Sequence, residues 1–210
     1  MLVTTFPVGP LQCNCSIIAC PETKEAIVID PGGDTEKIMD YIKQQGLTVK
    51  YLLHTHAHFD HILASSDIKD LTGAKICLHK ADKFLYDNLQ GQGMLFGFKA
   101  KKPSKIDHYL SDEEQVSVGN IKTSVLHTPG HTPGSLCFTL TDKNSLVFAG
   151  DTLFNQSIGR TDLPGGSFDD IIKSIKNRLF ILDDSTEVVP GHGESTSIWH
   201  EKKYNPFLNG

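Results

Sequence analysis

Long apolar runs are missing from this sequence of 210 residues. Segments such as Ala26–Ile29 and Tyr51–Leu53 fall far short of the ~20 residues that a membrane-spanning helix needs, so no membrane contact is expected. The N-terminus has no positive segment followed by an apolar stretch, which argues against a secretory signal. These absences favour a cytoplasmic protein.

An excess of basic charge is also missing. The chain has 20 basic and 25 acidic residues and a formal net charge of −5, so the electrostatic footprint of a nucleic-acid-binding protein is absent. Cysteine is sparse: five residues, an odd number, with no C-x-x-C pair. Reduced thiols in a cytoplasmic protein are therefore expected rather than a disulfide framework.

The composition that remains is that of an ordinary globular protein, with 39% hydrophobic and 21% charged residues. No repeat, low-complexity tract or linker divides the chain. At about 150 residues per domain, this predicts a single domain over residues 1–210.

Short apolar runs alternate with turns and helical patterns along the chain. Strands are predicted at 14–20, 25–30, 49–54, 75–79, 116–118, 122–127, 135–140, 145–149 and 187–189. Helices are predicted at 35–45 with Asp34 as N-cap, at 62–71, from about 81, at 168–182 and around Trp199. Short turns such as 141–144 favour antiparallel sheets with helices on their outer faces, a layered α/β sandwich. Residues 88–108 fit no element and read as a lid, a binding loop or a solvated surface loop.

Three of the ten histidines lie in one short run, 55–61, with the pattern H-x-H-x-D-H. Composition alone gives this pattern a chance of about 0.002. The run follows an apolar strand, and alternate side chains of an extended chain share a face, so His56, His58 and Asp60 can converge. His61 begins the next helix and turns away from that row. The spacing therefore predicts two neighbouring metal sites rather than one.

One short run cannot complete two coordination spheres, so further ligands are expected on loops that follow other strands. His131, Asp151 and His192 each follow a strand and a glycine. Taken singly, each histidine is better explained as a structural or solvated residue, but together behind the H-x-H-x-D-H run they favour ligation. Five histidines and two aspartates suit zinc, with iron or manganese as alternatives, and two divalent ions are expected.

These motifs resemble the metallo-β-lactamase-fold superfamily, and within it the short bacterial glyoxalase II-like hydrolases. The resemblance covers nearly the whole chain and rests on residues 30–34, the H-x-H-x-D-H run, 128–135, 150–154, 157–166, 190–193 and 201–207. It implies a four-layer αβ/βα sandwich with the metals at one edge of two facing sheets. It further implies one ion held by His56, His58 and His131, a second held by Asp60, His61 and His192, and Asp151 as the bridge.

The resemblance implies a hydrolase that cleaves a small-molecule thioester or ester such as S-lactoylglutathione, with a metal-bridging hydroxide as nucleophile and with Asp60 and Asp151 as catalytic residues. Arg160 is the first expected substrate contact, and the alternative is a fold-bracing pair with Asp162. Lys99 and Lys102 are weaker candidates for attracting an anionic substrate. The chain is expected to act as a monomer or homodimer.

Rival functions on the same residues stay open. A glutathione-persulfide dioxygenase would, by resemblance, hold one iron on His56, His131 and Asp151. A lactonase or another ester hydrolase would use the same dinuclear centre, and a non-catalytic metal-binding module would use only its ligands. A true β-lactamase is disfavoured because the zinc-dependent lactamases most often place cysteine where Asp151 stands and lack His61.

Overall fold

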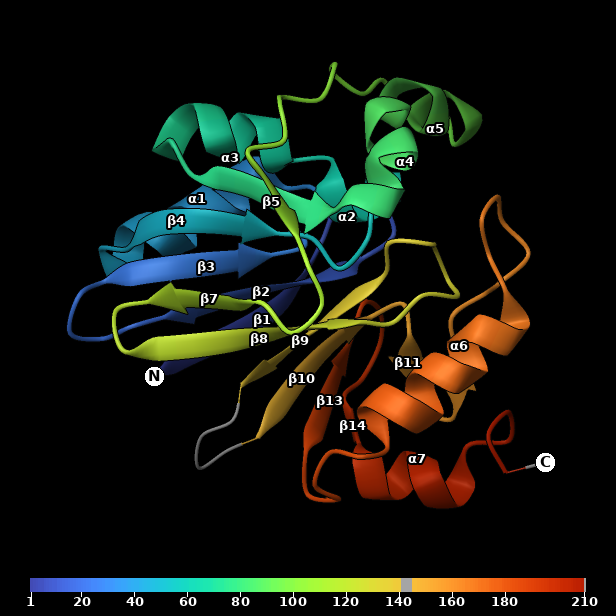
Figure 1. Ribbon diagram of the computed structural model, residues 1–210. Coiled ribbons are helices and arrows are strands. Elements are labelled where there is room, and N and C mark those ends of the chain that lie inside the picture. The colour runs from blue at the N-terminus through green and yellow to red at the C-terminus, as the bar shows by residue number, and fades with distance from the viewer. Residues whose placement is uncertain (141–144, 210) are drawn as a thin grey trace.

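Two six-stranded sheets face each other, and helices cover the outer face of each, in a computed structural model that describes residues 1–140 and 145–209. Figure 1 shows α1 and α3 beside the first sheet and α6 and α7 beside the second. The predicted four-layer αβ/βα architecture is confirmed. The turn predicted at 141–144 lies outside the described residues.

The first sheet has the strand order β1-β2-β3-β4-β5-β6. Its strands are β1 (Leu2–Val8), β2 (Cys13–Ala19), β3 (Glu25–Ile29), β4 (Thr48–Leu53), β5 (Lys75–His79) and β6 (His108–Leu110). The first three pair antiparallel, but β3, β4, β5 and β6 pair parallel. The expectation of antiparallel sheets was therefore wrong for three of the five strand pairs in this sheet. The helices α1 (Thr35–Gln45) and α3 (Ser65–Thr72) lie between these strands in the chain, and a helical crossover returns the chain in the same direction.

The second sheet has the order β14-β13-β10-β9-β8-β7. Its strands are β7 (Gln115–Val118), β8 (Ile121–His127), β9 (Leu136–Leu140), β10 (Leu146–Gly150), β13 (Glu187–Pro190) and β14 (Thr196–Ser197). Only β10 and β13 pair parallel, joined through α6 (Phe168–Ser174) and η2 (Ile175–Leu179). Because β9 runs antiparallel to both of its neighbours, β8, β10 and β13 all end at the same edge.

The remaining elements refine the sequence predictions. They are α2 (Phe59–Ile62), η1 (Lys80–Asp82), α4 (Lys83–Asp87), α5 (Leu89–Leu95), the small hairpin β11 (Leu153–Phe154) and β12 (Ser157–Ile158), and α7 (Ile198–Tyr204). The helix predicted at 62–71 is two helices, α2 and α3, and the unassigned stretch 88–108 contains α5. The strand β1 was missed. Asp34 does not cap α1 with its side chain, since its carboxylate accepts from Gly9 N at 3.0 Å instead.

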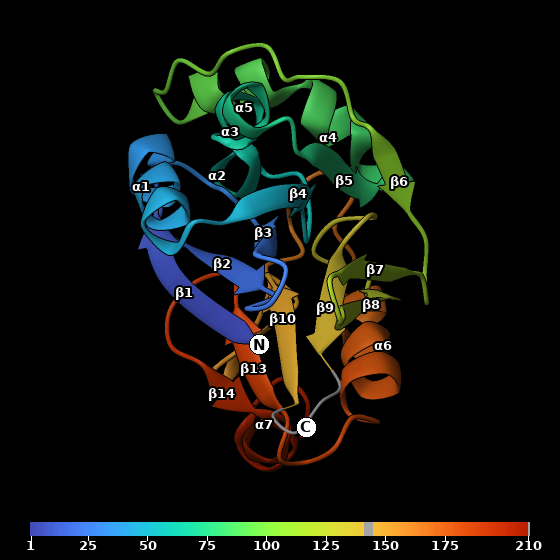
Figure 2. The same ribbon diagram turned by 90° about the vertical axis from the view of Figure 1, so that its left-hand side faces the viewer.

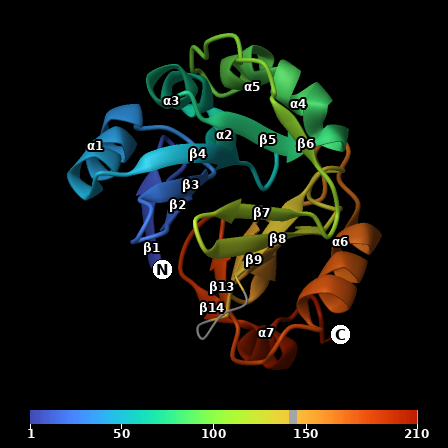
Figure 3. The ribbon, with the colours of Figure 1, turned by 60° about the vertical axis from the view of Figure 1, so that its left-hand side comes forward.

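The core consists of three apolar layers. One lies between the two sheets and includes Ile27, Leu53 and Phe138. Another packs the first sheet against α1, α3, α4 and α5, and the third packs the second sheet against α6, η2 and α7. Figures 2 and 3 show these outer helices on opposite sides of the paired sheets. The sandwich therefore fixes the loops at the sheet edge from both sides.

Two predictions that rest on the few cysteines and on the lack of long apolar runs can be compared with the fold. All five cysteines are buried and free, as expected for reduced thiols. Among the helices of the described residues, none combines the length and the apolar character needed to cross a bilayer.

Candidate metal centre

Histidine and aspartate side chains gather at the edge where β4 of the first sheet meets β8, β10 and β13 of the second. The β4–α2 loop and α2 supply the H-x-H-x-D-H run, the β8–β9 loop supplies His131, and the turns after β10 and β13 supply Asp151 and His192. All seven metal-ligating residues predicted from the sequence meet here. Strand ends from both sheets hold them, which is how α/β folds commonly mount a site.

Three imidazoles form the first group, which we call the imidazole triad: His56, His58 and His131. The Nε2 atom of His131 lies 2.9 Å from His58 Nδ1 and 3.2 Å from His56 Nε2. His56 and His131 are almost completely buried. Three ring nitrogens that converge in this way offer the donor set of a zinc or iron site.

The second group, the carboxylate triad, consists of Asp60, His61 and His192. His192 Nε2 lies 3.1 Å from Asp60 Oδ2 and 3.3 Å from His61 Nε2, and the Asp60–His61 pair is 3.6 Å apart. Asp60 and His61 come from the single turn of α2, so their side chains leave the backbone in different directions. This triad mixes oxygen and nitrogen donors.

Asp151 lies between the two triads. Its Oδ2 atom is 3.6 Å from His131 Nε2, while Oδ1 is 3.4 Å from His61 Nε2 and 3.8 Å from His192 Nε2. Each carboxylate oxygen therefore faces a different triad. Oδ1 is buried and has no hydrogen-bond partner, which is costly for a carboxylate unless a cation satisfies it. This orphaned oxygen and the surrounding donor set fit divalent metal ions.

Two members of the imidazole triad, His56 and His58, are held neutral by their surroundings. Burial, reinforced by the neighbouring histidines, holds the pKa of His56 well below its ordinary value. Burial, together with His131 and His61, lowers the pKa of His58 to about 4. Neutral imidazole is the form that binds a metal, so these two rings need lose no proton at neutral pH.

The carboxylate triad behaves in the opposite way. Burial alone would lower the pKa of His61, but nearby Cys13 and acidic groups, including Asp60 and Asp151, raise it well above its ordinary value. The pKa of His192 is raised as well, since the hydrogen bond that His192 donates to Asp60 and the charge of Asp151 outweigh its burial. The histidines in turn lower the pKa of both aspartates against the effect of burial.

The ring nitrogens that face away from the centre are also bound. Nδ1 of His131 donates to the Arg160 carbonyl oxygen at 2.8 Å, and Nδ1 of His192 donates to the Leu11 carbonyl oxygen at 3.0 Å. These bonds keep Nδ1 of both rings turned away from the centre, so that Nε2 is the nitrogen aimed at the metal site. Outer partners of this kind orient metal ligands.

Asp30, at the end of β3, supports His61. Its Oδ2 accepts from His61 Nδ1 at 3.0 Å and from Thr55 Oγ1 at 2.6 Å, and its Oδ1 accepts from Thr55 N at 2.8 Å. The Sγ atom of Cys13 lies 3.4 Å from the same His61 nitrogen. Sequence reasoning placed Asp30 in a family motif but gave it no contact, because nothing in the sequence connects residues 30 and 61.

Close backbone approach explains two glycines beside Asp151. A Cβ atom on Gly191 would lie 2.1 Å from Asp151 Oδ1, and one on Gly159 would lie 1.8 Å from the Asp151 carbonyl oxygen. Any side chain at either position would push Asp151 out of place. The glycine that precedes His192 in the sequence pattern thus has a steric origin.

The three predicted substrate contacts lie outside this cluster. Arg160 makes a bidentate pair with Asp162, both bonds at 2.8 Å, and both side chains are exposed. The backbone of Arg160 is nevertheless near the centre, because its carbonyl oxygen accepts a hydrogen bond from His131. Lys99 lines a separate cavity of about 530 Å³ beside α5. Lys102 is exposed in the segment between α5 and β6.

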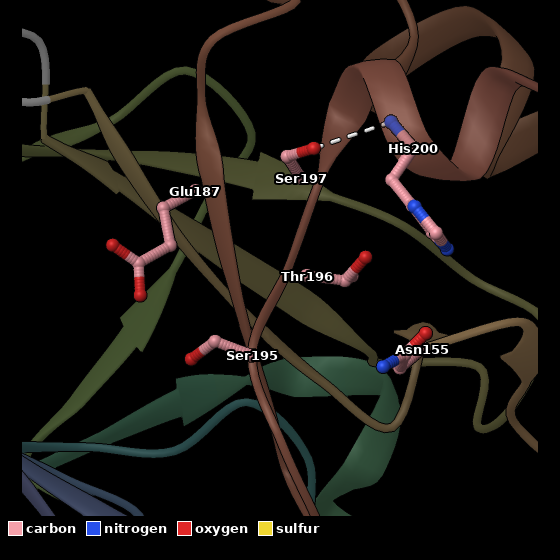
Figure 4. Close-up of a pocket in the computed structure, with 6 residues that line it drawn as sticks. All are labelled: Asn155, Glu187, Ser195, Thr196, Ser197 and His200. Carbon is pink, nitrogen blue, oxygen red and sulfur yellow. Dashed lines mark hydrogen bonds between the residues drawn. The ribbon is translucent and has the colours of Figure 1, made fainter.

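A second cavity, of about 340 Å³, lies beside β13 and β14 and is lined by Asn155, Glu187, Ser195, Thr196, Ser197 and His200. Figure 4 shows its side chains spread apart, with the Glu187 carboxylate pointing away from the His200 ring. The dashed bond is the cap of α7, in which His200 N donates to Ser197 Oγ at 3.2 Å. None of the residues predicted for the metal site lines this cavity.

Comparison with known proteins decides the family. The profile of the Metallo-beta-lactamase superfamily matches residues 8–192. The chain belongs to this superfamily. A relative from Haemophilus influenzae, named hydroxyacylglutathione hydrolase GloC, is 38% identical over 211 residues and covers 100% of this chain and 99% of its own.

Two solved structures of the metallo-β-lactamase superfamily match closely. The structure described as BLEG-1 B3 metallo-beta-lactamase has a TM-score of 0.92 and 38% identity, and each chain is covered completely. The structure of TTHA1623 in a di-iron-bound form has a TM-score of 0.88 and 35% identity, and covers 98% of this chain and 100% of its own. The protein is thus a member of a metal-dependent hydrolase superfamily with a histidine and aspartate cluster suited to divalent ions.

Proposed function

We propose that this protein is a dinuclear metal-dependent hydrolase of thioesters or esters. The observation that carries the proposal is the position of Asp151, whose two oxygens face different triads while the buried Oδ1 lacks a donor. The imidazole triad would hold one ion and the carboxylate triad the other. Zinc is our first choice, and the di-iron form of TTHA1623 makes iron the main alternative.

Divalent ions in such a centre supply a water nucleophile at neutral pH and stabilise negative charge on an attacked carbonyl oxygen. The chain contributes the positioning. Asp151 would fix the separation of the two ions. Asp60 and His192 would bind the ion on the more solvent-exposed side of the centre. A thiol has a pKa of about 8.5, so its thiolate can leave without a dedicated general acid. Thioester hydrolysis therefore does not require a further acidic residue beyond those predicted from the sequence.

We propose a glutathione thioester such as S-lactoylglutathione as the substrate. The name of the Haemophilus influenzae relative supports this class, since the match extends over both chains. Two divalent ions opposite the carboxylates of Asp60 and Asp151 leave the centre positive, which favours a substrate that carries carboxylates. The five free thiols fit a reducing compartment, and we place the protein in the cytoplasm.

The deciding experiment is the hydrolysis of S-lactoylglutathione by protein reconstituted with zinc, and separately with iron. We expect a kcat/KM of about 10⁴ M⁻¹s⁻¹ or more, the ordinary range for an enzyme on its own substrate. Metal-free protein is the control. Hydrolysis no faster with metal than without it would overturn the thioesterase proposal, and oxygen consumption with glutathione persulfide by the iron form would replace it with the dioxygenase.

A second candidate is the hydrolysis of β-lactams. It is favoured by the complete structural match to a protein described as a B3 metallo-beta-lactamase. The same zinc-loaded preparation should be tested with a chromogenic cephalosporin. A kcat/KM for the cephalosporin above that for the thioester would make the β-lactam the better substrate class.

A further inference from the structure

Asp82 is a buried carboxylate that contacts none of the seven candidate ligands. It ends η1, directly after β5, and its side chain is fully buried. Three donors surround it: Oδ2 accepts from Ala57 N at 3.0 Å and from Thr132 Oγ1 at 2.8 Å, and Oδ1 accepts from Gly134 N at 2.6 Å. Hydrogen bonds to a buried charged acceptor are the stronger kind.

The three donors belong to the two loops that carry the imidazole triad. Ala57 lies between His56 and His58 on the loop after β4 of the first sheet. Thr132 and Gly134 follow His131 on the β8–β9 loop of the second sheet. One carboxylate therefore joins, across the sandwich, the two segments whose relative position sets the distances within the triad.

The close fit around Asp82 makes this connection rigid. A Cβ atom on Gly134 would lie 2.6 Å from the Asp82 carboxylate, so glycine is needed for the loop to approach. On the opposite side, Thr132 Oγ1 also lies 2.8 Å from Ser135 Oγ. Neither loop can shift without breaking a bond to a buried charge, which is expensive because the charge would be left without a donor.

Asp82 and Asp30 support the centre in different ways. Asp30 binds His61 of the carboxylate triad directly and reaches His56 through Thr55, whose Oγ1 lies 3.1 Å from His56 Nδ1. The carboxylate of Asp82 instead accepts hydrogen bonds from the two loops that carry the imidazole triad. We propose that Asp82 is a positioning residue for the imidazole triad, setting the affinity and geometry of the ion held by His56, His58 and His131. This inference rests on the proposed metal centre.

The test is a two-site metal titration of the full-length protein, with Co²⁺ as the probe and its visible absorption bands as the readout. Variants His58→Gln and His192→Gln assign the bands to the imidazole and carboxylate triads. In Asp82→Ala we expect Co²⁺ affinity at the imidazole triad to fall by about 10–100-fold, the usual effect of losing an outer partner of a metal ligand. Affinity at the carboxylate triad should stay within about twofold of wild type.

Asp87→Ala is the matched control, because it removes an exposed carboxylate five residues later that pairs only with Lys83. It should change neither site. Asp82→Asn should recover part of the loss, since an amide oxygen can still accept from Ala57 N and Thr132, although its NH₂ group then faces Gly134 N–H. A merely structural role for Asp82 would lower the melting temperature while weakening both sites alike or neither, and this result would overturn the proposal.

If Asp82→Ala does not fold, Thr132→Val decides the question. It removes a single donor to Asp82 at nearly constant volume. A loss of affinity confined to the imidazole triad supports the proposal, and equal or absent effects at both triads overturn it. Failure of wild-type protein to bind a second Co²⁺ would instead refute the dinuclear function, while Asp82 could still be tested on the ion that binds.

Discussion

The two triads of the candidate centre lie side by side but differ in chemistry. In the imidazole triad, burial lowers the pKa values of His56 and His58, and the carboxylate of Asp82 accepts a hydrogen bond from the loop that carries both. The carboxylate triad contains Asp60 and two histidines with raised pKa values, and Asp30 binds one of them directly. The comparison teaches that one sheet edge can present a site ready to bind a metal next to a site that must first release protons.

The largest effect is expected where the two triads meet. Asp151→Asn removes the charge that both triads share, and we expect kcat for the thioester to fall by at least about 100-fold, because even outer partners of ligands commonly cost 10–100-fold. Steady-state kinetics of metal-loaded protein measures this. Asp169→Asn, on the exposed start of α6, is the control. A variant Asp151→Asn with wild-type kcat would remove Asp151 from the centre.

Next comes the support of the carboxylate triad. Asp30→Asn places an NH₂ group against Thr55 or His61, both of which already donate to Asp30. We expect metal affinity at the carboxylate triad to fall by about 10–100-fold, with little change at the imidazole triad. The two-site Co²⁺ titration measures both. An equal loss of Co²⁺ affinity at both triads would contradict the inference that Asp30 mainly supports the carboxylate triad.

Lowering the pH should weaken metal binding more at the carboxylate triad than at the imidazole triad, by a smaller amount than the substitutions above. His61 and His192 have raised pKa values, so they bind protons in the free protein, and a metal must displace these protons. Below their pKa values, affinity at the carboxylate triad should fall by up to about tenfold per pH unit for each displaced proton. His56 and His58, with the pKa of His58 at about 4, release no proton on binding a metal down to about pH 5, so metal affinity at the imidazole triad should fall less steeply. Metal titrations between pH 5 and 8 check this, and the opposite order of metal loss would contradict it.

The smallest effect concerns Arg160, outside both triads. If its guanidinium contacts a substrate carboxylate, Arg160→Ala should raise KM a few-fold and leave kcat and the melting temperature nearly unchanged. The exposed pair with Asp162 contributes little to stability. An unchanged KM together with a lower melting temperature would make Arg160 a brace of its loop, the alternative that the sequence left open.

The sequence was sufficient to predict which seven side chains meet at the sheet edge, because metal ligands are side chains with restricted chemistry. Four of them lie within residues 56–61, and each of the others follows a strand and a glycine. Asp82 could not be found in this way. Two of its three donors are backbone N–H groups of Ala57 and Gly134, and every residue except proline carries such a donor.

The direction of the strands was predictable but was misjudged. The helix 35–45 was correctly expected between β3 and β4, and a helical connection between neighbouring strands is typical of parallel pairing. Short turns between strands were given more weight, although the turn that joins β2 and β3 governs only that antiparallel pair. For Asp34, local sequence favoured a cap, but the backbone is in the left-handed region at φ 47° and the carboxylate binds Gly9 instead.

The distance along the chain between the members of one triad has a consequence for the order of events during synthesis. His61 and His192 touch through their Nε2 atoms but are 131 residues apart in sequence. A nascent chain that has completed the first sheet carries Asp60 and His61 without their third partner, and closing so long a loop is entropically costly until the second sheet has formed. In the proposed dinuclear centre, full metal loading would follow completion of the sandwich, and the presence of both ions would mark a chain that has finished folding.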